Sequence, residues 1–135
     1  MKTLGLLSNL DLLGEPESAA KARAHVRQVL RDIDGVEVET AELLVSELVA
    51  NTIQHSMSGY RPDGVVRLYV SATRRVLHVD VIDQGPVDGV PQIPVKVDAL
   101  SECGRGLWLV GALSSAWGWA ADHAGQTVWF ELARS

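Results

Sequence analysis

Three polar side chains recur every four residues within an apolar segment, namely Glu47, Asn51 and His55. Residues four apart share one side of an α-helix, so these three would form a polar row beside a buried stripe. The carboxylate of Glu47 could accept a proton from an attacking hydroxyl or water. The amide oxygen of Asn51 suits Mg²⁺, which prefers hard oxygen ligands and keeps several waters. Satisfied polar residues at a helix edge would give the same pattern, and this alternative stays open.

A second candidate lies where a predicted strand ends at Asp83. Leu77, Val79 and Val81 alternate along that strand. Asp83 continues their register, so its carboxylate should point to the same buried side. Such a carboxylate is a good acceptor for the exocyclic amine of adenine, and Gly85 leaves room for the base to approach the backbone. A simple strand-exit turn is the alternative interpretation of this segment.

A third candidate is the glycine pair of Gly104-Arg105-Gly106, which precedes an apolar helix that starts at Leu107. Backbone N–H groups at a helix start bind phosphate, and Arg105 could add a charge-assisted contact. An ordinary helix-start turn would look the same. Residues 84–102 contain three prolines and two glycines without periodicity, and a loop of this length is commonly a lid. Together the three candidates predict a pocket for ATP with Mg²⁺.

The elements that would position these residues follow from the hydrophobic periodicity. We expect strands over 3–13, 65–72, 76–83, 117–122 and 127–133, a helix start at 14–18, and helices over 19–31, 40–56 and 106–116. In the last strand, Trp129 and Glu131 should face away from Val128, Phe130 and Leu132. The alternating strands then present one apolar face that a layer of helices can cover.

The first predicted helix carries a basic stripe of Lys21, Arg23, Arg27 and Arg31 in an otherwise acidic protein. Four cations on one helix face are compatible with two interpretations. They are either a solvated surface or a docking surface for an acidic partner.

The composition limits the class of protein. With 135 residues, 47% of them hydrophobic, the chain can bury the core of a single domain spanning 1–135. A net charge of −5 argues against broad nucleic-acid binding, and no segment is apolar for long enough to span a bilayer. The lone Cys103 excludes an internal disulfide. The apolar start is interrupted too early for a signal peptide, so we expect a cytoplasmic protein.

Four motifs in order resemble those of the GHKL ATPases, the superfamily of histidine kinases, gyrase B and MutL. Residues 47–55 (ELVANTIQH) resemble the N box, 83–85 (DQG) the first glycine box and 104–107 (GRGL) the second. Residues 125–128 (GQTV) are similar to the final Gly-x-Thr. Within the superfamily the chain is most similar to anti-sigma factor serine/threonine kinases of the SpoIIAB and RsbW type. The resemblance extends from about residue 15 to residue 132.

This resemblance implies roles for individual residues. Glu47 would be the general base, Asn51 the magnesium ligand and Asp83 the adenine-binding residue supported by Thr127. His55 matches a common N-box position and would lie at the nucleotide site. Further along the chain, the resemblance places phosphate contacts at Gly104, Arg105, Gly106 and Leu107 under a lid of roughly residues 86–103.

The resemblance also implies a fold and an activity. The fold would be a two-layer α/β (α+β) sandwich, with a mixed, mostly antiparallel sheet covered on one face by helices. The activity would be phosphorylation of a STAS-type anti-anti-sigma protein, combined with sequestration of a sigma factor. A homodimer is possible. The alternative is a non-catalytic ATP-binding interaction module of the same fold. A histidine kinase fragment would need a phospho-acceptor hairpin that the sequence lacks.

Overall fold

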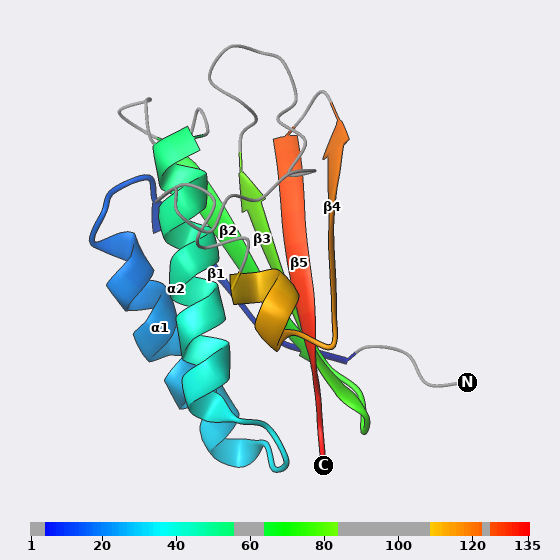
Figure 1. Cartoon of the computed structure of the whole chain (residues 1–135). Coiled ribbons are helices and arrows are strands. Elements are labelled where there is room, and N and C mark those ends of the chain that lie inside the picture. The colour runs from blue at the N-terminus through cyan, green and yellow to red at the C-terminus, as the bar shows by residue number, and fades with distance from the viewer. Residues whose placement is uncertain (1–4, 56–63, 84–108, 123–124) are drawn as a thin grey trace.

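The computed structural model describes residues 5–55, 64–83, 109–122 and 125–135. Helices cover one face of a five-stranded sheet, which makes two layers (Figure 1). The elements are β1 (Gly5–Leu13), α1 (Ser18–Val29), η1 (Leu30–Asp32), α2 (Val38–His55), β2 (Val65–Ala72), β3 (Val76–Asp83), β4 (Ala116–Asp122) and β5 (Gly125–Ala133). Residues 109–113 are also helical. The predicted two-layer fold is confirmed.

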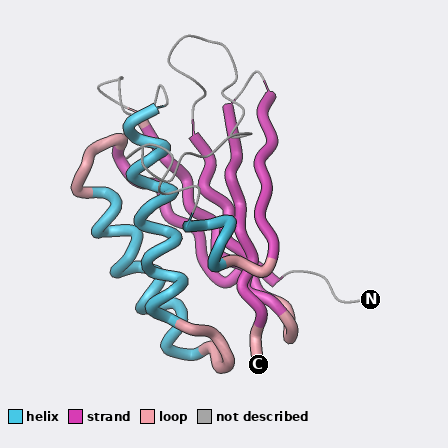
Figure 2. Tube along the Cα trace, viewed as in Figure 1, coloured by secondary structure: helices cyan, strands magenta, loops and turns pink. Residues whose placement is uncertain are grey.

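The strand order in the sheet is β1-β2-β3-β5-β4, and each of the four pairings within the described part of the chain is antiparallel. Figure 2 shows the strands side by side, with the helices on one side of them. The bounds of β2 and β3 are those predicted, because clear alternation and the turn at Thr73 mark their ends. The last strand starts at Gly125, two residues earlier than predicted, because Gly125 pairs with Asp122 in the hairpin.

The helix bounds shift by a few residues from the predicted ones. The first helix starts at Ser18, whose buried hydroxyl donates a hydrogen bond to the carbonyl of Leu13 at 2.6 Å. The acids before it therefore precede the first turn instead of occupying it. After the 3-10 turn, Gly35 takes φ of +80°, a left-handed conformation that glycine adopts at little cost. The second helix then begins at Val38.

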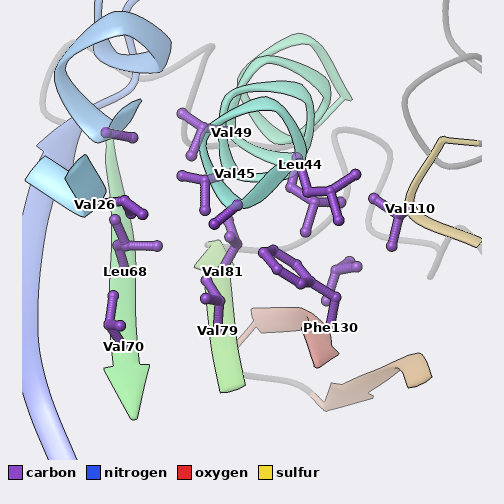
Figure 3. Packing of buried hydrophobic residues seen from close by; sticks show 14 of the residues in the cluster. Val26, Leu44, Val45, Val49, Leu68, Val70, Val79, Val81, Val110 and Phe130 are labelled. Atoms are coloured by element: carbon purple, nitrogen blue, oxygen red, sulfur yellow. The ribbon is translucent and has the colours of Figure 1, made fainter. Parts of the chain in front are cut away.

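The core lies between the helices and the sheet. Val45 and Val49 of α2 pack over the strands near Val79, and Phe130 of β5 fills the space beneath Leu44 (Figure 3). Phe130 and Leu44 are fully buried. The predicted alternation of the last strand is confirmed, because Val128, Phe130 and Leu132 are buried while Trp129 and Glu131 are partly exposed. Removal of this apolar surface from water is the dominant favourable contribution to the free energy of folding.

One member of the basic stripe of α1 is used within the chain. Arg27 donates from Nε and Nη2 to both carboxylate oxygens of Glu42 on α2. Arg27 is therefore an exposed member of the stripe that also binds Glu42, and the choice between a solvated surface and a docking surface stays open. Lys21, Arg23 and Arg31 are exposed.

The face of the sheet away from the helices carries a polar network around His78. Its Nδ1 lies 2.9 Å from Oε2 of Glu131, and its Nε2 lies 3.0 Å from Oδ1 of Asp80. The imidazole stacks on the indole of Trp129 with ring centroids 5.3 Å apart. Trp129 in turn lies over Gly118, where a Cβ atom would come within 2.8 Å of the indole. This glycine makes room for the large side chain across the strand pair.

Candidate nucleotide site

Asp83 is buried at the end of β3. Its exposed fraction is 8%, and it continues the buried positions Leu77, Val79 and Val81 on the helix-covered face. The prediction that it points to the buried side is confirmed. In the antiparallel register its partner on β5 is Gln126, which is also buried, with 9% exposed. Directly opposed residues share one face of a sheet, so this carboxylate and this amide are cross-strand neighbours.

Glu47 and Asn51 lie on α2, and both are partly exposed. Glu42 marks the side of that helix that faces α1, because it binds Arg27. At 3.6 residues per turn, Glu47 is about 140° and Asn51 about 180° around the helix from Glu42. The polar row therefore lies on the side of α2 away from α1.

That side of α2 is the one toward β5. Figure 3 shows Leu44 on the side of α2 toward Phe130 and Val110. Asn51 follows Leu44 by seven residues, so the two side chains leave the helix within about 20° of one another. The helix then continues from Asn51 to its end at His55. The predicted magnesium ligand thus leaves α2 on the side that faces β5, the strand that carries Gln126.

Three element ends lie at the same end of the molecule. The C-terminal end of α2, the end of β3 and the beginning of β5 come together there (Figure 1). The structure therefore brings the part of α2 with Asn51 to the end of the sheet that carries Asp83 and Gln126. Glu47 lies one turn further from this end on α2.

Thr127 lies on the other face of the sheet from Asp83. Its partner in the register is Ile82, and it is partly exposed, whereas Gln126 and Val128 on either side of it are buried. Successive side chains of a strand point to opposite faces. The structure therefore does not bring Thr127 to Asp83, and Gln126 occupies the position expected for it.

The other predicted site residues are outside the part of the chain that the structure describes. They are Gly85, Gly104, Arg105, Gly106 and Leu107, together with the proposed lid at 86–103. His55 ends α2, and the placement of its side chain is likewise not described. Their proposed phosphate and nucleotide contacts remain predictions.

The donor set fits a magnesium nucleotide. Asp83 offers a buried acceptor, which suits a donor such as the amine of adenine. The described ranges contain no group of three His, Cys, Asp or Glu side chains able to hold a metal ion. Magnesium bound with a nucleotide needs only one or two protein ligands besides phosphates and waters, so Asn51 is a suitable one.

Among the described helices, none is long and apolar enough to cross a membrane.

The sequence matches a family model described as the histidine kinase-like ATPase domain over residues 12–132. The family predicted from the motifs is thereby confirmed. No curated protein matches the sequence significantly.

Solved structures share this fold. The RsbU and RsbW domains of Rv1364c from Mycobacterium tuberculosis align with a TM-score of 0.65 at 20% identity, over 95% of this chain and 33% of that one. The blue-light activated histidine kinase of Erythrobacter litoralis EL346 aligns with a TM-score of 0.57 at 24% identity, over 89% and 48%. The separately solved histidine kinase domain of that protein aligns with a TM-score of 0.54 at 27% identity, over 87% of this chain and 63% of that one. This chain thus spans between a third and just under two thirds of those structures.

Proposed function

Because the chain belongs to the histidine kinase-like ATPase domain family, we propose that it binds ATP with Mg²⁺ and transfers the γ-phosphoryl group to a serine or threonine of a protein partner. The observation that carries this proposal is the buried carboxylate of Asp83 at the sheet end next to the C-terminal half of α2. A carboxylate accepts several hydrogen bonds, so a buried one at the end of a strand can bind the exocyclic amine of a nucleotide base in addition to its contacts within the protein.

The residues of this chain would divide the work among them. Asp83 accepts a hydrogen bond from the base and so holds the nucleotide in register. Asn51 contributes an amide oxygen to Mg²⁺, whose charge offsets that of the phosphates. Glu47, one helical turn earlier, accepts the proton of the attacking hydroxyl. Gly85 and residues 104–107 would cradle the base and the phosphates, as the motif resemblance implies.

The proposed partners follow from the same comparison. The likeness to a structure containing an RsbW domain supports a regulator of the anti-sigma type, with a STAS-type anti-anti-sigma protein as the phosphorylation substrate. In this proposal a sigma factor is bound when the anti-anti-sigma partner is phosphorylated. The protein would act in the cytoplasm, without direct contact with nucleic acid or membrane, and as a possible homodimer.

The experiment is a transfer assay with γ-labelled ATP and candidate STAS-type proteins. Wild type should label a partner, and Glu47→Gln should reduce labelling by about 100-fold, the lower range for loss of a general base. Glu47→Gln should still bind ATP. The exposed Glu39 on the same helix provides the matched control, and Glu39→Gln should label the partner as wild type does. Equal labelling by both variants would remove Glu47 from the mechanism.

A non-catalytic binding module gives a different result in the same assay. ATP binding would then be lost in Asp83→Asn, while no partner becomes labelled with wild type.

A further inference from the structure

A buried amide stands beside the buried carboxylate of the candidate site. Gln126 and Asp83 are paired in the β3–β5 register, and both lie on the helix-covered face. Cross-strand partners in an antiparallel pair have Cβ atoms about 5 Å apart. Glutamine is mostly exposed in proteins, so a buried glutamine beside a buried carboxylate marks a polar pair at the end of the sheet that forms the candidate site.

Adenine presents two adjacent groups on its Watson–Crick edge, the N6 amine, which donates, and N1, which accepts. An ionised carboxylate can only accept, whereas a glutamine amide carries two N–H donors. We propose, on the basis of the ATP binding proposed above, that Gln126 donates its side-chain N–H to N1 of adenine while Asp83 accepts from N6. Gln126 is then a specificity-determining residue that reads the base directly.

The same pair explains how other bases are rejected. Guanine carries an acceptor at O6, so its edge would set one acceptor against another at the carboxylate of Asp83, whereas the Gln126 amide could turn its oxygen toward the N1–H of guanine. A site built to hydrogen-bond one edge rejects a mismatched edge strongly, because its own buried polar groups are left unpaired. Thr127 cannot contribute in this way, since it lies on the other face of β5.

The test is an ATP titration by calorimetry, repeated with 1-deaza-ATP, in which a C–H group replaces N1. Wild type should bind ATP about fivefold more tightly than 1-deaza-ATP, the effect of one hydrogen bond. Gln126→Met should weaken ATP binding about fivefold and leave 1-deaza-ATP unchanged. Gln28→Met, at an exposed glutamine of α1, is the matched control and should bind both nucleotides as wild type does.

A second variant keeps the test decisive if Gln126→Met unfolds. Gln126→Glu preserves the shape and replaces the donor with an acceptor, so it should weaken ATP more than Gln126→Met does. Thermal unfolding without nucleotide reports whether each variant is folded.

Two outcomes overturn the assignment of Gln126. One is an equal loss of affinity for ATP and 1-deaza-ATP in Gln126→Met, which marks a merely structural role. The other is a selective loss in Thr127→Val. Failure of the proposed ATP binding itself looks different, because ATP then fails to bind wild type or binds Asp83→Asn equally well.

Discussion

Arg27 of α1 holds both carboxylate oxygens of Glu42 of α2, one through Nε and one through Nη2, the latter at 2.9 Å. The two side chains differ in environment, because Glu42 is buried and Arg27 is largely exposed. Bidentate pairs of this kind fix geometry as well as charge. The ion pair links α2, which carries Glu47 and Asn51, to α1. It lies on the side of α2 opposite to those two residues.

The first prediction concerns the pH dependence of this pair. Hydrogen bonds from Arg27 lower the pKa of Glu42 from its ordinary value of 4.5. The stabilisation is therefore present above that value and is lost as the pH falls through the lowered pKa. Glu42→Gln should reduce the Tm near pH 7, and the difference from wild type should shrink at acid pH. Arg31→Gln, an exposed arginine after α1, should show no such dependence.

The second prediction concerns His78. Burial lowers its pKa, but hydrogen bonds to Glu131 and Asp80 outweigh burial and raise the pKa above its ordinary value of 6.5. The stabilisation is then complete below 6.5 and is lost as the pH rises through the raised pKa. Chemical denaturation of His78→Gln should show a loss of about 1 kcal/mol near pH 5.5 that becomes smaller near pH 9.

His25 supplies the matched control for that measurement. It contacts the Ser8 hydroxyl at 2.7 Å, and burial lowers its pKa. Protonation therefore disfavours the folded state, so His25→Gln should gain stability relative to wild type as the pH falls. If both histidine variants respond to pH with the same sign, the assigned charge of His78 is wrong.

The third prediction uses two glycines with opposite surroundings. A Cβ at Gly118 would lie 2.8 Å from the indole of Trp129, so Gly118→Ala should destabilise the protein by about 1–3 kcal/mol. A Cβ at Gly111 would meet its nearest atom, Nε1 of Trp117, at 3.4 Å. Gly111 lies in the helical segment 109–113, where alanine is the better helix former. Gly111→Ala should therefore leave the stability unchanged or raise it by about 0.5 kcal/mol. Urea unfolding of both variants measures the contrast, and equal effects would contradict the packing of Trp129 over Gly118.

The fourth prediction concerns magnesium. If Asn51 is a ligand, Asn51→Ala should reduce the gain in ATP affinity that Mg²⁺ provides by about tenfold, a loss typical of weakened metal coordination. Affinity measured with EDTA should stay the same. Asn9→Ala, at an exposed position of β1, is the control. An unchanged magnesium response in Asn51→Ala would exclude this residue as a ligand.

Most of the fold could be predicted from the sequence because its patterns are local. Clear alternation defines β2 and β3, and the apolar stripe defines α2. The ends were less predictable. The start of β5 depends on pairing of Gly125 with Asp122, and the start of α1 on a hydrogen bond from Ser18 to Leu13. Such contacts join separate segments, so the helix and strand propensities of the individual residues do not predict them.

Sequence motifs and hydrophobic alternation predicted only some residues of the candidate site. Asp83 could be placed on the buried face because three valine and leucine positions set the register before it. Gln126 was missed, although the same alternation that buries Val128 and Phe130 also buries it once β5 is extended by two residues. The pairing of Arg27 with Glu42 joins two helices, and no spacing within either helix predicts it.

The strand order has a consequence for synthesis on the ribosome. The strand that follows all others in the sequence, β5, is inserted between β3 and β4. Until β5 emerges, β3 has one unpaired edge, and β4 lacks the one strand that it pairs with in the described part of the sheet. The apolar face that Phe130 later fills stays open for the same interval. A chain in which β5 is not yet in place therefore exposes an unpaired strand edge and apolar side chains, and both favour association with other chains.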